Sequence, residues 1–305
     1  MSNQYYSHGK LLITGEYFVL EGSLALAVPL KLGQSMVVTS LHDSRGELTW
    51  ETHIKNELWF QAVFNLRNLE ITKTNISSAA LYLQKLLLAV KRNSNVLSAT
   101  QQDLSIKTNL EFPLEWGLGS SSSLISNLAY WSNTNPYQLL SKTSEGSGYD
   151  IACARSNGSI FYRIQDTPSV TEARFNPTFL ENIYFVYLGR KQNSLSSVQQ
   201  YGDKIKGKTT EAEAITEISN SIIHSKTLKE FENHIVHHES IISSSLNTPT
   251  VKSQYFSDFK GSIKSLGAWG GDFIMATSHG NSEYVAQYFH GKGLNIIFPY
   301  KKLVL

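Results

Sequence analysis

A run of glycine and serine residues in the middle of the chain has the clearest chemical meaning. It consists of Gly117, Leu118, Gly119, Ser120, Ser121, Ser122 and Ser123. Glycine lets the backbone approach a ligand closely, and the free N–H groups of a helix start attract anions. Serine hydroxyls bind phosphate oxygens or Mg²⁺. The run therefore predicts a phosphate-binding loop, although many such loops bind nothing and the Gly-Lys-Ser/Thr of a Walker loop is absent.

Lys10 and Asp150 are the charged residues best suited to chemistry on a phosphate. Both lie in glycine-bearing segments: Lys10 follows Gly9, and Asp150 ends the stretch Gly-Ser-Gly-Tyr-Asp. A carboxylate accepts or orients the proton of an acceptor group, and a lysine lowers the pKa of that acceptor. Each residue also has an ordinary structural interpretation. Lys10 suits the surface end of a strand, and Asp150 suits a helix cap.

Two further glycine-bearing segments lie toward the ends of the chain. The first reads His-Gly-Lys-Leu-Leu-Ile-Thr-Gly-Glu-Tyr-Phe-Val-Leu-Glu-Gly from residue 8, and the second reads Gly-Ala-Trp-Gly-Gly-Asp-Phe from residue 267. We call them motif one (8–22) and motif three (267–273), and the central segment 115–124 is motif two. In their order and spacing the three segments resemble the motifs of the GHMP kinases. This superfamily includes galactokinase, homoserine kinase, mevalonate kinase and phosphomevalonate kinase.

A fourth stretch narrows this resemblance. Residues 146–150 are similar to the Gly-Ser-Gly-Phe-Asp segment of phosphomevalonate kinases, with tyrosine in place of phenylalanine. Residues 189–197 resemble the stretch after the first strand of the C-terminal lobe in the same enzymes. The resemblance spans about residues 8 to 277 and favours the kinases over the related mevalonate decarboxylases.

The resemblance implies roles for individual residues. Lys10 and Asp150 match the catalytic lysine and the acidic residue beside the phosphoryl acceptor. The loop 117–123 would hold the β- and γ-phosphates of ATP, and Ser121 matches the serine that contacts Mg²⁺. ATP and Mg²⁺ are therefore the expected cofactors.

Further residues are expected to contact the substrate or the metal. The substrate set is Glu16, Tyr17, Ser147, Lys191, Ser194, Gly270, Gly271 and Asp272. Lys191 and Ser194 are included because a substrate phosphate needs a lysine and hydroxyls nearby, and Ser197 is a further candidate for the same contact. Glu145 is a second candidate Mg²⁺ ligand. Its register differs from that of the metal-binding glutamate of mevalonate kinase, which favours a structural role.

Several positions depart from the family pattern. His8 stands where proline is usual, Trp116 replaces a small residue in motif two, and Trp269 replaces a glycine in motif three. Tryptophan beside a phosphate loop narrows or reshapes a pocket. The departures therefore bear on the identity of the substrate more than on the fold.

The predicted function is ATP-dependent phosphorylation of mevalonate or phosphomevalonate, a step of isoprenoid precursor synthesis. Two alternatives stay open. One is a GHMP kinase for another alcohol, such as a sugar or homoserine. The other is a catalytically silent protein of this fold that binds a ligand or a partner.

The hydrophobic pattern predicts strands and helices that mix throughout the chain. Strands are expected at 10–14, 24–30, 35–41, 103–107, 158–164, 183–188, 273–277 and 294–298, with a β-ribbon at 46–60. Helices are expected at 77–91, 124–131, 211–223, 227–245 and 281–290, where apolar residues recur every three to four positions. This pattern predicts an α+β protein. The resemblance implies the two-lobed GHMP kinase fold, with an N-terminal ribosomal-protein-like lobe (1–166) and a C-terminal ferredoxin-like lobe (167–305).

Composition agrees with a soluble enzyme of small molecules. The 305 residues are 41% hydrophobic and 17% charged, and the net charge of +2 is too small to favour nucleic acid or a membrane surface. No apolar run reaches the length of a membrane span, no signal peptide is visible, and a single cysteine suits a cytoplasmic protein. We expect a small-molecule substrate, while the sequence leaves monomer and homodimer open.

Three histidines on one predicted helix, His234, His237 and His238, raise the question of a metal site. No cysteine and no suitably spaced glutamate accompanies them. An exposed helix face is the favoured interpretation, and Cys153, within an apolar run, is expected to be a buried thiol.

Overall fold

The computed structural model describes residues 2–143, 146–189 and 194–305, and these residues form an α+β fold. The chain divides into two compact units. Unit 1 consists of Met1–Gly9, Leu32–Leu114 and Leu118–Arg155, and unit 2 consists of Lys10–Lys31, Glu115–Gly117 and Ser156–Leu305. Residues 10–31 and 156–166 thus group with the C-terminal half, and a boundary after residue 166 stays a prediction.

Unit 1 is built on a twisted sheet with the strand order β5-β4-β3-β6-β2. The strands are β5 (Ile71–Thr74), β4 (Glu57–Asn65), β3 (Glu47–Ile54), β6 (Leu104–Leu110) and β2 (Ala25–Ser40), and β1 (Ser2–Thr14) also pairs with β2. β3 and β6 are parallel, whereas the other pairs on this path are antiparallel. The long strands β1 and β2 continue from one unit into the other.

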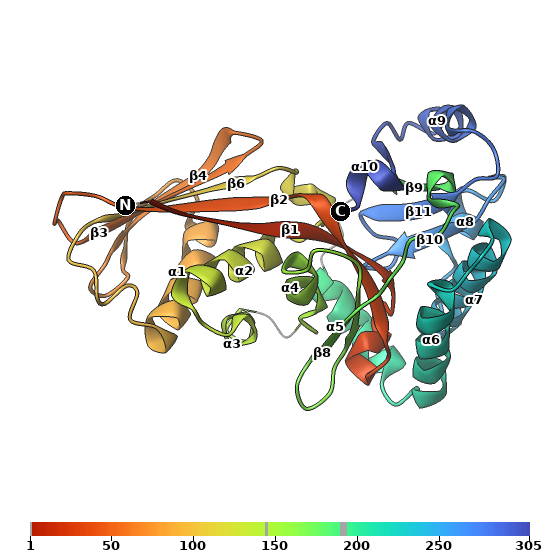
Figure 1. Ribbon diagram of the computed structural model, residues 1–305, viewed down its shortest axis with the longest axis horizontal. Helices are drawn as coiled ribbons and strands as arrows, with labels where there is room; N and C mark the ends of the chain where they lie inside the picture. Colours follow the sequence, from red (N-terminus) through yellow and green to blue (C-terminus); the bar gives the residue numbers. More distant parts are fainter. Residues whose placement is uncertain (1, 144–145, 190–193) are drawn as a thin grey trace. The chain divides into compact units, whose positions relative to one another are not determined.

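Helices cover one face of this sheet (Figure 1). They are α1 (Ser77–Asn93), α2 (Ser120–Ser132), α3 (Pro136–Leu140) and α4 (Tyr149–Ala154). The apolar stripe predicted for α1 is confirmed: Ala80, Leu83, Leu87 and Val90 are all buried, and they share a core with Trp50 of β3. Ile125 and Leu128 of α2 belong to the same core, so the helix that follows the loop of motif two packs there too.

Unit 2 contains an antiparallel sheet with the strand order β10-β11-β9-β12. The strands are β9 (Ile183–Tyr187), β10 (Ile263–Leu266), β11 (Phe273–Thr277) and β12 (Ile297–Pro299). The helices are α5 (Ser194–Ile205), α6 (Thr209–Ile222), α7 (Leu228–Leu246), α8 (Val251–Tyr255), α9 (Ser282–His290) and α10 (Tyr300–Leu303). Helices connect β9 to β10 and β11 to β12, which is the split βαβ connection of a ferredoxin-like lobe.

Two more strands of unit 2 extend the first half of β2. β7 (Ile160–Arg163) pairs with β2 at residues 25–27, and β8 (Ser169–Glu172) pairs with β7. Short 3₁₀ turns lie at Phe18–Glu21, Leu114–Trp116 and Leu180–Asn182. No helix among the described residues has the length and apolar character needed to cross a membrane.

The prediction of two strands at 24–30 and 35–41 was wrong, because β2 runs unbroken from Ala25 to Ser40. Gly33 lies inside this strand, where β1 comes very close. A Cβ added there would lie 2.4 Å from the carbonyl oxygen of Ser7. The glycine therefore permits a close approach of two backbones rather than a turn. Short elements such as β8, β10 and α8 were not predicted.

Candidate active site

Motif two enters helix α2 through a left-handed glycine. Gly119 has φ of 98° and precedes Ser120, the first residue of the helix. The hydroxyl of Ser122 donates to the Gly119 carbonyl at 2.9 Å, and Ser123 lies 2.9 Å from Gln34 Oε1. Both side chains are buried. Of the four serines, Ser120 and Ser121 therefore keep accessible side chains at the start of the helix, where backbone N–H groups attract anions.

Tyr82 of α1 is a site residue that the sequence analysis missed. Its hydroxyl forms a hydrogen bond with the hydroxyl of Ser121. Burial raises the pKa of Tyr82, and the negative charge of Asp150 adds to this effect. Nothing in the sequence marks Tyr82, because it stands among apolar residues of a helix that belongs to no motif.

Asp150 is the second residue of α4 and follows Gly148, which has φ of 84°. Its Oδ1 accepts a hydrogen bond from the Ile151 amide at 3.0 Å, and the side chain is half-buried. Burial, and then the charge of Asp150, raises the pKa of Tyr137 as well. Ser147, three residues earlier in the chain, is also half-buried. Asp150 thus stabilises the first turn of its helix and places a negative charge near two phenols.

Residues of all three motifs meet within unit 2. The ammonium group of Lys10 donates to the carbonyl oxygen of Gly117 at 3.0 Å. Gly117 has φ of 66°, and a Cβ added there would lie 1.9 Å from Asp272 Oδ2. Glycine is therefore required at 117 for both its conformation and its space. One lysine, one loop carbonyl and one carboxylate come together here.

The two unusual tryptophans are structural anchors in unit 2. Trp116 packs its ring against Tyr187, Phe273 and Phe298 of the four-stranded sheet, with centroids 5.5 to 6.1 Å apart. Trp269 is buried, and its indole N–H donates to the Pro249 carbonyl at 3.3 Å. The rings thus attach the first residues of motif two (Glu115–Gly117) and motif three to the core of unit 2.

Glu16 and Tyr17 of motif one are buried rather than exposed. Glu16 is 1% exposed, and its Oε1 accepts a hydrogen bond from the Lys264 ammonium at 2.6 Å. The Tyr17 hydroxyl accepts a hydrogen bond from the Trp269 amide at 2.8 Å. Both residues thus form hydrogen bonds to protein atoms, and their contact with a substrate stays a prediction.

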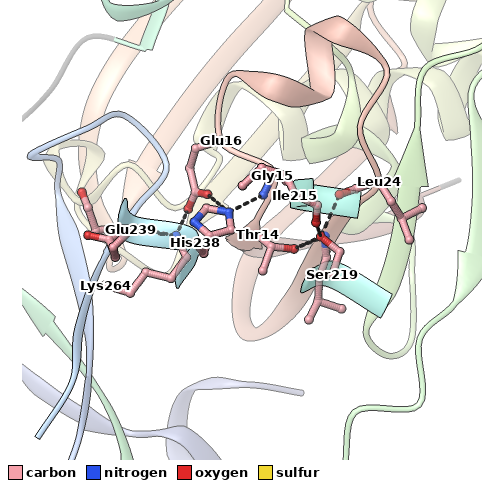
Figure 2. Close-up of polar contacts among 11 residues, drawn as sticks. Thr14, Gly15, Glu16, Leu24, Ile215, Ser219, His238, Glu239 and Lys264 are labelled. Carbon is pink, nitrogen blue, oxygen red and sulfur yellow. Dashed lines mark hydrogen bonds and ion pairs between the residues drawn. The ribbon is translucent and has the colours of Figure 1, made fainter. Parts of the chain in front are cut away.

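A compact polar cluster surrounds Glu16 (Figure 2). We call Glu16, His238, Glu239 and Lys264 the Lys264 cluster; all four are buried, with at most 3% of their surface exposed. His238 Nε2 accepts a hydrogen bond from the Gly15 amide at 3.1 Å and lies 3.2 Å from Glu16 Oε2. Lys264 Nζ lies 3.6 Å from Glu239 Oε1. The cluster therefore joins the motif-one turn to α7 and β10.

The Lys264 cluster holds two carboxyl groups for one ammonium group. Burial and the nearby charge of Glu16 raise the pKa of Glu239 to about 8, despite the opposing effect of Lys264. Burial also raises the pKa of Glu16, and Lys264 opposes this shift. Burial and Lys264 lower the pKa of His238 well below its ordinary value. These shifts favour the protonated form of Glu239 and the uncharged form of His238.

His238 corrects the prediction of an exposed helix face, since this ring is fully buried while His237 is exposed. His238 projects toward the motif-one turn because α7 packs its apolar face inward. Within the described residues no three acidic, histidine or cysteine side chains group as a metal site. Cys153 is buried, as predicted.

Three predicted site residues cannot be placed fully. Glu145 and Lys191 lie outside the described residues. Ser194 is the first residue of α5, and its side chain, like that of Ser197, lies outside the described part of the structure. Gly270, Gly271 and Asp272 lie in the motif-three loop between β10 and β11.

Comparison with solved structures finds the same fold in small-molecule kinases. The Methanococcus jannaschii mevalonate kinase is 17% identical, with a TM-score of 0.69 over 98% of this chain and 97% of that chain. The Streptococcus pneumoniae phosphomevalonate kinase in complex with phosphomevalonate and AMPPNP is 16% identical, with a TM-score of 0.72 over 97% and 99%. The Lactococcus lactis galactokinase complexed with galactose is 11% identical, with a TM-score of 0.63 over 97% and 92%. No protein-family model and no curated protein matches the chain. The structural likenesses confirm the predicted GHMP kinase fold.

Proposed function

We propose that this chain is an ATP-dependent phosphotransferase of the GHMP kinase type that acts on mevalonate or phosphomevalonate. Motif two carries the proposal. Its two glycines with positive φ lead into a helix whose first turn presents the accessible Ser121, in a fold shared with kinases. A helix start of this kind binds phosphate through backbone N–H groups. The AMPPNP complex of the pneumococcal relative supports ATP as the donor.

In the proposed reaction the acceptor oxygen bonds to the γ-phosphorus of ATP, the bond to the β–γ bridging oxygen breaks, and ADP leaves. Such transfers depend on positioning and charge neutralisation. Asp150 receives or orients the proton of an alcohol acceptor. Lys10 supplies a positive charge, which stabilises negative charge on the reacting oxygens.

Ser121 fits a role as one ligand of Mg²⁺, because its hydroxyl lies on an exposed side chain at the start of α2. Mg²⁺ takes few protein ligands and keeps water and phosphate oxygens in its shell. When bound, the ion would neutralise charge on the phosphate oxygens of ATP. The hydrogen bond to Tyr82 gives the Ser121 hydroxyl a defined direction.

Two kinds of acceptor remain within this proposal. Mevalonate and sugars offer an alcohol, which always carries its proton. A phosphate monoester has lost most of its second proton at neutral pH, because that pKa is about 6. Dependence of turnover on the carboxylate of Asp150 should therefore be stronger for an alcohol acceptor. The likeness to galactokinase keeps a sugar as the second candidate.

ADP release with Mg-ATP tests the proposal against a panel of mevalonate, phosphomevalonate, galactose, homoserine and buffer alone. Turnover that depends on mevalonate or phosphomevalonate supports it and identifies the acceptor. Turnover with galactose or homoserine alone would identify a GHMP-type kinase whose acceptor is an alcohol other than mevalonate. AMPPNP binding without turnover on any acceptor favours a silent ligand-binding relative, and absence of both contradicts a kinase.

A further inference from the structure

The motif-three loop is held by its backbone amides from two directions. The Trp269 amide donates to the Tyr17 hydroxyl at 2.8 Å, and the Gly270 amide donates to Ser265 Oγ at 3.0 Å. Ser265 lies on β10 outside every motif and is 1% exposed. Tyr17 and Ser265 thus bind consecutive amides of a loop whose next residues are Gly271 and Asp272.

The loop conformation leaves little freedom once these amides are held. Gly270 has φ of 72°, which favours glycine, and a Cβ added at Gly271 would lie 2.1 Å from the Ala268 carbonyl oxygen. The carbonyl oxygen of Asp272 accepts a hydrogen bond from the Leu188 amide at 2.8 Å, so the far end of the loop is also attached.

Tyr17 holds its position in an uncommon conformation. Its φ is 59° and its ψ is −48°, values that are rare for a residue with a side chain. Such a conformation persists only where the surroundings enforce it, and it concentrates at functional sites. Here the ring is buried in a core with Phe18 and Trp269, and its hydroxyl accepts a hydrogen bond from the Trp269 amide.

The Lys264 cluster fixes Ser265 from the other side. Successive residues of a strand point to opposite faces, so Lys264 enters the cluster while Ser265 turns its hydroxyl toward the loop. Lys264 Nζ donates to Glu16 Oε1 at 2.6 Å and to the Ser265 carbonyl at 3.0 Å. Glu16 is the neighbour of Tyr17 in the chain. The Lys264 ammonium group is therefore bonded both to Ser265 and to the residue next to Tyr17, the two residues that bind the loop amides.

We propose that Tyr17 and Ser265 are positioning residues that fix the motif-three loop for phosphoryl transfer, and that Lys264 holds both of them. This inference rests on the proposed function, in which Gly270, Gly271 and Asp272 lie beside the substrate. Catalysis depends steeply on such positioning.

The first test compares Ser265→Ala with Ser278→Ala. Ser278 is a matched control because it is fully buried and its Oγ accepts the Gly280 amide at 3.0 Å, outside the motifs. We expect Ser265→Ala to lower kcat/KM for the acceptor about tenfold, with KM for ATP and the melting temperature close to those of Ser278→Ala. An equal kinetic loss in both variants overturns the proposal.

Amide hydrogen exchange gives a second readout that needs no substrate. Exchange in residues 267–272 should become about tenfold faster in Ser265→Ala and in Tyr17→Phe, and should stay unchanged in Ser278→Ala. Unchanged exchange in Ser265→Ala and Tyr17→Phe overturns the proposal even in an active enzyme. If exchange becomes faster but the wild-type protein shows no turnover, Tyr17 and Ser265 still anchor the loop, and the proposed kinase function is contradicted instead.

The double variant Glu16→Gln/Lys264→Met tests the role of Lys264. It removes the ammonium group without leaving Glu16 as an unpaired buried charge. If Lys264 holds Tyr17 and Ser265 in place, amide exchange in 267–272 should be faster in this double variant than in the wild type. This should hold even if the melting temperature of the double variant is higher than that of Lys264→Met. If the exchange rate and the melting temperature both return toward wild-type values, Lys264 only stabilises the fold, and that part of the proposal is contradicted.

Discussion

Gly117 and Asp272 approach so closely that a Cβ at Gly117 would lie 1.9 Å from Asp272 Oδ2. Gly117→Ala forces this carboxylate aside and strains a backbone with φ of 66°. We expect AMPPNP binding to weaken at least about tenfold, because motif two must shift. Gly207→Ala is the control, since it has φ of 76° with no atom near its added Cβ. Equal AMPPNP affinity in the two variants would contradict this prediction.

Asp150→Asn tests the proposed proton acceptor. The amide keeps the shape of the side chain and an oxygen for the Ile151 amide, but it cannot take a proton. With an alcohol acceptor we expect kcat to fall at least about a hundredfold, with AMPPNP affinity nearly unchanged. Steady-state ADP release and a nucleotide titration measure the two quantities. Asp166→Asn, at an exposed loop position, should leave both unchanged.

Ser121→Ala and Ser123→Ala should separate activity from stability. Ser121 is exposed, so its loss should lower activity and raise the Mg²⁺ concentration needed for half-maximal rate, with little change in melting temperature. Ser123 is buried and bonded to Gln34 and Gly119, so its loss should cost about 1 to 2 kcal/mol of unfolding free energy. Chemical denaturation and a Mg²⁺ titration check both. The reverse pattern would remove Ser121 from the site.

Tyr82→Phe removes the hydroxyl that bonds to Ser121 and keeps the ring. If this bond orients Ser121, kcat/KM for Mg-ATP should fall about fivefold, and the same change in a Ser121→Ala background should have no further effect. A double-mutant cycle measures this coupling. Additive losses would show that Tyr82 acts independently of Ser121. Tyr130→Phe serves as the control, because that ring is exposed on α2 and lies against Arg155.

The Lys264 cluster makes stability depend on pH. Below pH 4.5 the Glu239 carboxyl is protonated in both the folded and the unfolded chain; as pH rises toward about 8, only the unfolded chain releases the proton. Folding stability therefore falls across this window, by up to about 1.4 kcal/mol per pH unit. The lowered pKa of His238 acts in the opposite direction, so its contribution is lost as pH falls below 6.5.

Melting temperatures from pH 4 to 9 measure this dependence in the wild type and in Glu239→Gln. The variant has no carboxyl at position 239, and Glu16 is the one cluster carboxyl left to titrate, so its curve should be flatter between pH 5 and 8 than that of the wild type. Glu213→Gln on α6 is exposed and should leave the slope unchanged. A wild-type slope retained in Glu239→Gln would place the titrating group elsewhere.

The sequence alone determined the local features of this protein. Periodic apolar residues identified α1, α6 and α7, because a helix buries a stripe that recurs every three to four residues. Motif two could be predicted as a loop before a helix because glycine and serine have local conformational preferences. The order of the motifs led to the correct fold.

Only the tertiary structure decided which polar groups face inward. Glu16, His238, Glu239 and Lys264 are ordinary surface residue types from three separate segments of the chain, yet they share one buried cluster. The tertiary structure also decided two pairings that no local pattern indicated, the Tyr82 hydroxyl with Ser121 and the Ser265 hydroxyl with the Gly270 amide. Local sequence patterns report which side of an element is apolar. A polar side chain is buried when groups from other elements satisfy it, and that depends on packing between distant segments.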